Sequence, residues 1–84
     1  MKKSKAVLAS VEIEKNDDGF LARIPGIQGA FAEGDTVEDA IFNCIDVATM
    51  IFEYRKERNE PIGFNEFDLD KNMRMTFAFP IGIV

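Results

Sequence analysis

Residues 36–58 read TVEDAIFNCIDVATMIFEYRKER, and this stretch decides the fold because its apolar residues recur at the spacing of one helix face. Thr36 and Asp39 resemble a capping box, with Asp in place of the usual Glu or Gln. Basic residues gather at the end of the stretch, where the helix dipole favours them, and Pro61 prevents continuation. We predict one helix from about Val37 to Glu57, roughly 30 Å long at about 1.5 Å per residue.

Three short strands are predicted before the helix. Apolar residues alternate with others through residues 6–15 and again through residues 20–24. The Asn-Asp-Asp-Gly sequence at 16–19 joins these runs as a hairpin, because glycine adopts positive φ without steric cost. Pro25-Gly26-Ile27-Gln28-Gly29 then breaks the pattern, and residues 30–33 are long enough for a third strand. The predicted strands are antiparallel to one another in succession.

A fourth strand is predicted after the helix. Residues 59–72 are mostly polar and irregular, with Phe64, Phe67 and Leu69 as candidate anchors, whereas residues 73–79 alternate again. The order β-β-β-α-β predicts a single α+β domain over residues 1–84, with one long helix packed on a small mixed sheet. We expect the fourth strand to lie beside the first at the centre of that sheet.

Composition limits the classes of function. The chain has 84 residues, of which 46% are apolar and 30% charged, as in a globular domain. Fifteen acidic and ten basic residues give a net charge of −5, which argues against broad nucleic-acid binding. The same charge suits a basic protein partner, and simple solubility is the alternative explanation.

Cysteine and histidine usage excludes several kinds of site. Cys44 is the only cysteine and there is no histidine, so the chain forms no internal disulfide, no Cys-rich zinc site and no His-activated nucleophile. Cys44 is in phase with the apolar helix residues and is expected to be buried. The basic N-terminus is not followed by a long apolar stretch, so we expect neither a signal peptide nor a membrane span, and a cytoplasmic location.

The middle of the chain carries a series of strand, turn and helix-start motifs in a fixed order. Asp18-Gly19-Phe20, Ala22 and Ile24-Pro25-Gly26-Ile27-Gln28-Gly29 are followed in order by Gly34-Asp35-Thr36-Val37-Glu38-Asp39-Ala40. This order resembles the pattern of the HicB-like antitoxin family, in which a strand enters a Pro-Gly bend and Gly-Asp-Thr-x-Glu-Asp-Ala then begins a helix. Glu60-Pro61-Ile62 resembles the later proline-containing stretch of that family. The structural motif comprises Gly19, Pro25, Gly26, Gly29, Gly34, Asp35 and Thr36.

The resemblance implies a fold and a partner. HicB-like domains have a partial ribonuclease-H-like fold, form dimers or larger assemblies, and block HicA, a small basic mRNA-cleaving toxin. Many members add a C-terminal DNA-binding domain, and no sequence for one follows residues 73–79 here. We therefore expect a homo-oligomer that binds a HicA-like toxin without a cofactor, and no direct nucleic-acid binding by this chain alone.

Two groups of residues are candidate contact sites. The first is acidic and would contact the toxin electrostatically: Glu12, Glu14, Glu33 and Asp35. The second is apolar and would contact a second copy or a partner: Phe42, Ile45, Phe79, Ile81 and Ile83. For the helix residues of this group, coverage by Phe64 and Phe67 is the alternative. The apolar tail has the alternative of docking on its own sheet.

Two other functions stay open at this point. One is a stand-alone oligomeric interaction module with no toxin partner. The other is a degenerate metal-dependent nuclease, which needs carboxylates that converge from several elements. The available carboxylates look too scattered for this, because Glu12 and Glu14 are on the first predicted strand and Glu38 and Asp39 are at the helix start. We expect no catalytic and no metal-binding residues.

Overall fold

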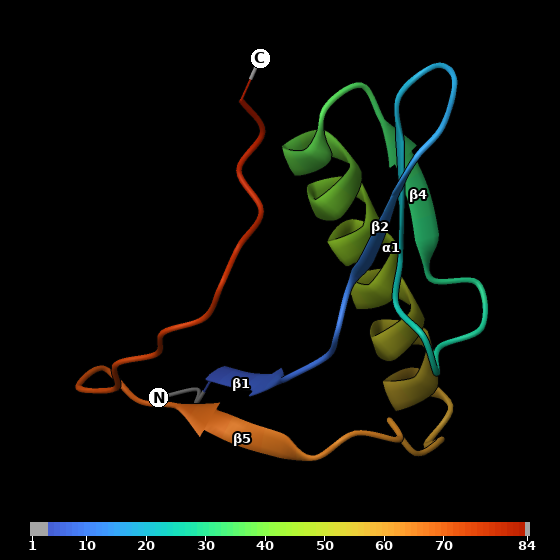
Figure 1. Cartoon of the computed structure of the whole chain (residues 1–84). Helices are drawn as coiled ribbons and strands as arrows, with labels where there is room; N and C mark the ends of the chain where they lie inside the picture. The colour runs from blue at the N-terminus through green and yellow to red at the C-terminus, as the bar shows by residue number, and fades with distance from the viewer. Residues whose placement is uncertain (1–3, 84) are drawn as a thin grey trace.

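Helix α1 (Val37–Glu57) lies across one face of a three-stranded sheet in the computed structural model, which describes residues 4–83 (Figure 1). The predicted bounds of the helix are confirmed. Thr36 is the N-cap, and its hydroxyl accepts a hydrogen bond of 3.0 Å from the amide of Asp39. At the other end Asn59 adopts a left-handed φ of 57°, a common way to end a helix, just before Pro61.

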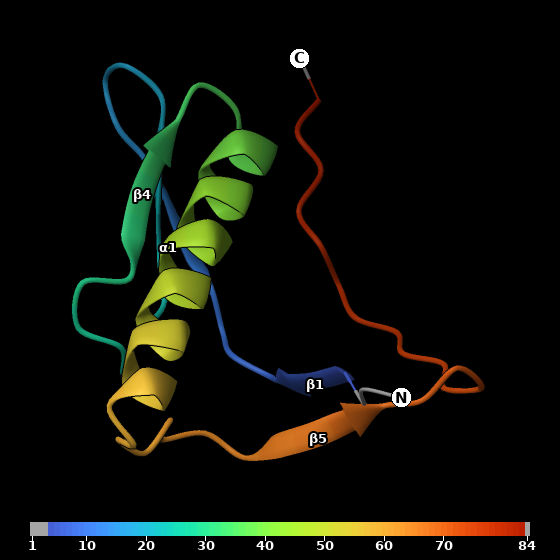
Figure 2. The same cartoon turned by 180° about the vertical axis from the view of Figure 1, so that it is seen from behind.

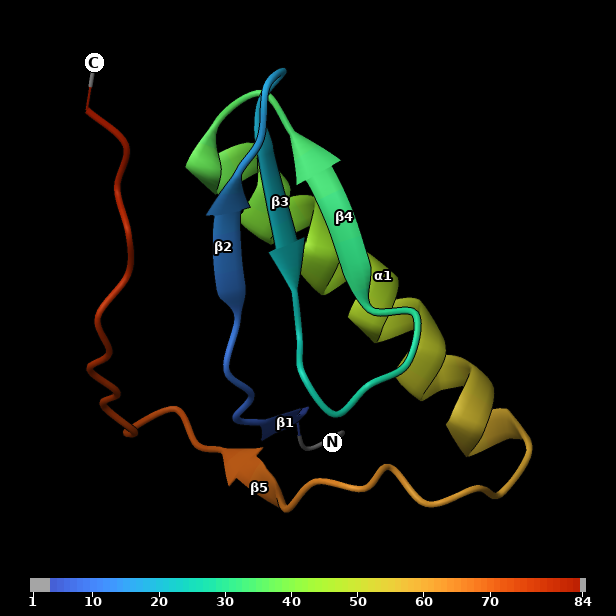
Figure 3. The same ribbon diagram turned by 45° about the vertical axis from the view of Figure 1, so that its right-hand side comes forward.

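The three-stranded sheet is the predicted antiparallel meander. Its strands are β2 (Glu12–Lys15), β3 (Phe20–Arg23) and β4 (Phe31–Gly34), in the order β2-β3-β4 (Figure 3). The register aligns Ile13, Ala22 and Ala32 across the sheet, and these side chains face α1. Because side chains alternate between the two faces, the neighbouring row of Glu14, Leu21 and Glu33 faces away from the helix.

Two more strands form a separate ribbon. β1 (Ser4–Val7) pairs antiparallel with β5 (Glu66–Leu69), and Lys5 Nζ lies 2.9 Å from Asp68 Oδ1. The hydrogen bond to Asp68 raises the pKa of the Lys5 ammonium. The prediction of one strand over residues 6–15 was therefore wrong, since residues 8–11 are outside any strand. The chain leaves one sheet at Val7 and enters the other at Glu12.

The core between sheet and helix is built from small side chains. Ala22, Ala30, Ala40, Cys44 and Ala48 are all buried, together with Ile24, Ile27 and Ile41. The small residues permit close approach of the backbones. A Cβ on Gly34 would overlap the amide nitrogen of Ala40, and a Cβ on Gly19 would lie 2.5 Å from the carbonyl oxygen of Gly34. Glycines therefore set the spacing between hairpin, sheet and helix.

The fourth predicted strand is wrong. Residues 73–79 form no strand and run alongside α1 toward the start of the helix (Figure 2). The strand after the helix is instead β5, in the stretch predicted to be irregular. It occupies an edge of β1, so the first strand is not at the centre of a sheet. The predicted mixed sheet is also wrong, because every strand pair of residues 4–83 is antiparallel.

Candidate protein-interaction surfaces

The face of the three-stranded sheet opposite α1 is open to solvent. We call it the outer sheet face, and it is made of Glu12, Glu14, Leu21, Arg23, Phe31 and Glu33. Phe31 is 60% exposed although it is a large aromatic residue in a strand. The face thus combines carboxylates with an exposed aromatic side chain, a composition found at protein interfaces.

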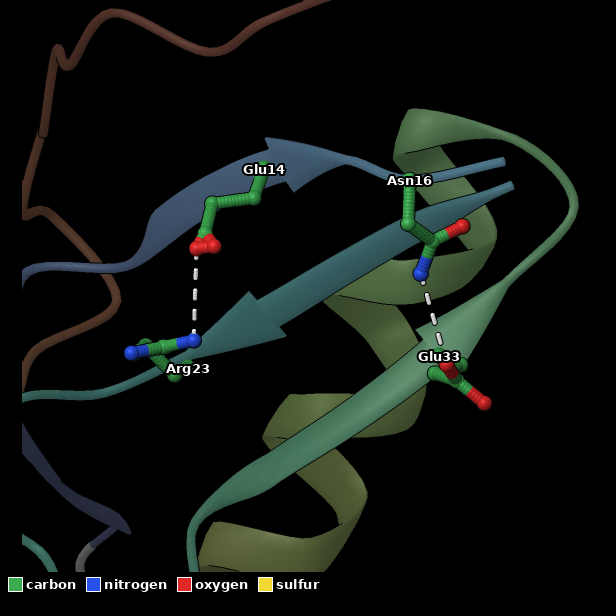
Figure 4. Close-up of polar contacts among 4 residues, drawn as sticks. All are labelled: Glu14, Asn16, Arg23 and Glu33. Carbon is green, nitrogen blue, oxygen red and sulfur yellow. Dashed lines mark hydrogen bonds and ion pairs between the residues drawn. The ribbon is translucent and has the colours of Figure 1, made fainter. Parts of the chain in front are cut away.

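Hydrogen bonds and ion pairs fix the side chains on the outer sheet face. Arg23 Nη2 donates to Glu14 Oε2 at 3.3 Å, and Asn16 Nδ2 donates to Glu33 Oε2 at 3.3 Å (Figure 4). These contacts link β2 to β3 and the hairpin turn to β4. Three carboxylates and one guanidinium leave a net charge of −2 on this face.

More acidic residues lie at one end of the sheet. Asp17, Asp18, Glu33 and Asp35 line a shallow depression between the hairpin turn and the turn that precedes α1. Three of the four acidic residues predicted as contacts, Glu12, Glu14 and Glu33, are thus on the outer sheet face, and Asp35 is at its end. In the described part of the chain, no three His, Cys, Asp or Glu side chains are placed to hold a metal ion.

The carboxylates required by a nuclease are not brought together. Glu12 and Glu14 extend from the outer sheet face, whereas Glu38 and Asp39 are in the first turn of α1, on the other side of the sheet. The carboxylate of Glu38 accepts a hydrogen bond of 3.3 Å from the amide of Gly82.

The second candidate surface, which we call the apolar groove, has a volume of about 840 Å³. Its walls come from β1 and the following residues 8–11, from α1, from β5 and from residues 75–80. They include Val7, Ile41, Ile45, Phe52, Phe67 and Phe77. Phe67 of β5 thus lies at the groove, while Phe64 packs against Phe52 with ring centroids 6.1 Å apart.

The predicted apolar contact residues are exposed, and one pair is in contact. Phe42 is 55% exposed and its ring centroid lies 6.1 Å from that of Phe79. Ile45 is 40% exposed and lines the apolar groove together with Phe67, whereas Phe42 has the ring of Phe79 beside it. Ile81 and Ile83 are the most exposed of the set.

The apolar part of the outer sheet face was not predicted from the sequence. Leu21 and Phe31 are in register with Glu14, Glu33 and Arg23 but were not named as contact residues. The alternation of residues 20–24 places Leu21 on the face opposite the buried residues, so the sequence did contain a signal that Leu21 faces outward. For Phe31 the same signal existed, since Phe31 and Glu33 are in phase.

Cys44 and the glycines of the sequence motif have structural positions. Cys44 is fully buried, its thiol donates to the carbonyl oxygen of Ala30 at 3.6 Å, and burial raises its pKa. Gly26 and Gly29 have φ values of 91° and 88°, which favour glycine, and they shape the bend between β3 and β4. These residues support the fold and offer no reactive group at the surface.

Three comparisons with known proteins give the same result. No family model, no curated protein and no solved structure matches this chain. Within residues 4–83, the structure has no helix with the length and apolar character needed to span a bilayer.

Proposed function

We propose that this chain is a HicB-like antitoxin domain that binds a small basic HicA-type mRNA-cleaving toxin and masks its RNA-binding surface. The observation that carries the proposal is the outer sheet face, where carboxylates surround two apolar side chains. The proposed role is binding and not catalysis. It requires no cofactor and no direct contact between this chain and nucleic acid, and its proposed location is the cytoplasm.

Electrostatic complementarity supports this kind of partner. A protein that holds RNA needs a basic surface, because phosphate contacts dominate the affinity for nucleic acid. The outer sheet face presents Glu12, Glu14 and Glu33 to such a surface, and the chain as a whole carries −5. Opposite charges on the two proteins would speed association and exclude acidic partners.

The apolar side chains of the outer sheet face would provide the affinity. Phe31 is exposed on β4 directly opposite Arg23, and Leu21 lies on the same face of β3, diagonally from Phe31. Buried aromatic residues inside a polar rim supply most of the binding energy in protein interfaces. The carboxylates around Phe31 would form this rim and orient the toxin.

The order of elements is consistent with the proposed family. After β1, this chain has three antiparallel strands followed by a long helix, namely β2, β3, β4 and α1, and the proposed β-β-β-α-β order begins with the same four elements. We propose that the chain has a partial ribonuclease-H-like fold and that it forms a homo-oligomer. The Gly34–Thr36 turn, which carries the family pattern, places Asp35 at the end of the acidic surface.

The test is a titration of this chain with the product of the adjacent gene, for which the proposal requires a small basic protein of the HicA type. We expect the double variant Glu14→Lys/Glu33→Lys to bind at least about 100-fold more weakly, because two like charges then face a basic surface. The matched control Asp46→Lys/Glu57→Lys changes the net charge equally on exposed helix positions and should cost less than about five-fold. Absence of a complex at micromolar concentrations, or equal loss in both variants, would reject the proposal.

A second candidate function is a stand-alone oligomeric interaction module without a toxin partner. The observation that favours it is the exposure of large apolar residues away from the outer sheet face, such as Phe42, Ile45 and Phe77. Such a module would form oligomers and bind no HicA-type protein. The titration above, combined with a measurement of mass in solution, separates the two functions.

A further inference from the structure

We infer that residues 73–79 of one copy add as a strand to the free edge of β2 in a second copy, so that two chains exchange these segments. The product would be one continuous antiparallel sheet through both copies. In each half the order would be β4, β3, β2 and then residues 73–79 of the partner, and a two-fold axis would relate the two halves. This inference specifies how the proposed homo-oligomer is built. It holds whether or not a toxin binds the outer sheet face.

The first observation is an unpaired sheet edge. In the order β2-β3-β4, strand β2 is bonded to β3 on one side only. In the described part of the chain, no backbone hydrogen bond joins its other edge to another strand. An edge of this kind presents a row of free N–H and C=O groups and is a template for pairing with another chain.

The second observation is that α1 extends its apolar surface beyond this edge. Ile41, Ile45 and Phe52 line the apolar groove on the flank of the helix, next to residues 8–11, which lead into β2. A further strand beside β2 would place its inward side chains against this flank. The groove therefore lies where the next strand of the sheet would pack.

The third observation is the character of residues 73–79. Met73, Met75, Phe77 and Phe79 alternate with Arg74, Thr76 and Ala78, as in a strand with one buried face. The segment nevertheless belongs to no strand, and Phe77 is 66% exposed. Pro80 follows and would end the strand. The segment thus has the pattern of a strand but lacks a ladder partner.

Strand direction favours a second copy over the chain's own segment. Residues 73–83 start at the end of the molecule where β1 and β5 lie and run in the same direction as β2 (Figure 3). Pairing within one chain would therefore be parallel, whereas every pairing of residues 4–83 is antiparallel. A copy related by a two-fold axis perpendicular to the sheet supplies its segment in the antiparallel direction, which is slightly more stable.

The area available for burial approaches that of a stable dimer. The exchanged strand exposes four large apolar side chains, namely Met73, Met75, Phe77 and Phe79. At on the order of 100 Å² each, exchange in both directions would remove roughly 800 Å² of strand surface from water, and the groove walls that the two strands cover bring the total toward the range of specific interfaces. The core of one chain is small by comparison, since Cys44 is its largest fully buried side chain.

Few contacts need to break for the exchange. The segment is held by the turn in which the amide of Met73 donates to the carbonyl of Asp70 at 2.9 Å, by Phe79 on Phe42, by Gly82 on Glu38, and by the wall of the apolar groove that residues 75–80 form; none of these is a strand ladder. Residues 70–72 would act as the hinge. Exchange of a terminal segment about a short hinge is a low-cost route to dimers.

The test begins with light scattering of the whole chain. We expect a mass near twice the 9.5 kDa of one chain. Thr76→Pro removes a ladder donor at the middle of the segment and should weaken the dimer at least about ten-fold, whereas Thr76→Ser should leave it unchanged. A monomer at tens of micromolar, or a dimer insensitive to Thr76→Pro, would overturn the inference.

Cysteine pairing then tests which chain fills the edge. Glu14→Cys in one copy and Thr76→Cys or Ala78→Cys in the other should give a disulfide between copies after mixing and refolding, because all three positions face outward in the proposed sheet. Glu57→Cys replaces Glu14→Cys as the control and should give none. A disulfide within single chains carrying both cysteines, at monomer mass, would show that the segment closes on its own sheet and would reject the exchange. Toxin binding retained by Thr76→Pro separates this outcome from failure of the proposed function.

Discussion

The backbone of Gly34 lies against the amide nitrogen of Ala40 so closely that a Cβ on residue 34 would overlap it and would also lie 2.7 Å from the carbonyl carbon of Asp39. The atoms that the Cβ would meet are backbone atoms of the first helical turn, so no side-chain rotation could relieve the contact. The end of β4 and the start of α1 are therefore held at a distance that only glycine permits.

Gly34→Ala is expected to destabilise the fold by about 2 kcal/mol or more, because the strand and the helix must separate to admit one methyl group. Urea unfolding followed by circular dichroism measures the change. Gly82→Ala is the matched control, since its Cβ would meet only the flexible carboxylate of Glu38, at 3.2 Å. The close approach is unimportant if both variants unfold at the same urea concentration.

Thr36→Ala is expected to cost about 1 kcal/mol, because it removes the hydroxyl that accepts the hydrogen bond from the Asp39 amide. Thr36→Ser keeps an acceptor at the same position and should recover most of this loss. Thermal unfolding of the three proteins provides the comparison. Equal melting temperatures for the Ala and Ser variants would contradict the capping role.

Cys44 is expected to make stability fall at alkaline pH. Burial raises the pKa of its thiol in the folded state, so folding favours the protonated form. This contribution is fully present below the ordinary thiol pKa of about 8.5 and is lost as the pH rises through the folded value. Urea unfolding at a series of pH values, with Cys44→Ala as control, isolates the effect.

The same burial should also block reaction of Cys44. The folded protein should react with a disulfide reagent at a rate limited by opening, and urea should accelerate the reaction strongly. Rapid labelling of the thiol in the folded protein would contradict the placement of Cys44 against Ala30.

Backbone amides of β3 are expected to exchange with deuterium much more slowly than those of β1 and β5. β3 is the central strand of its sheet and carries the fully buried Ala22, whereas β1 and β5 form an isolated ribbon with four residue pairs. A two-stranded ribbon is marginally stable by itself. Hydrogen exchange read by NMR tests this order, and equal protection of both sheets would refute it.

Phe31→Ser is expected to leave stability within about 0.5 kcal/mol of the original, because the side chain is mostly exposed, but to weaken binding of the proposed toxin. Leu8→Ser is the matched control, since Leu8 is 69% exposed and is not part of the outer sheet face. Calorimetric titration of both variants gives the answer. Similar affinities for the two would place the binding surface elsewhere.

The sequence predicted the helix and the meander because both depend on local signals. The Thr36 cap and Pro61 delimit α1, and the turn at residues 16–19 forms the predicted hairpin. The reason given for Gly19 was wrong, because Gly19 has no positive φ and instead permits the close approach of the Gly34 carbonyl. The order of the remaining strands depends on contacts between distant segments. Residues 66–69 and 73–79 both alternate, and only the pairing of β5 with β1 decides which becomes a strand. The alternation of the sequence was sufficient to predict the acidic residues of the outer sheet face. The open edge of β2 could be recognised only from the three-dimensional arrangement of the strands.

The antiparallel register of β1 and β5 places Ser4 directly opposite Leu69. Paired residues in such a ribbon have Cα atoms about 5 Å apart, so residues 4–69 begin and end at adjacent points. A segment with adjacent ends can be inserted into a surface loop of a host protein without straining that loop. We therefore expect residues 4–69, inserted into a surface loop of a fluorescent host protein, to leave the fluorescence of that host unchanged.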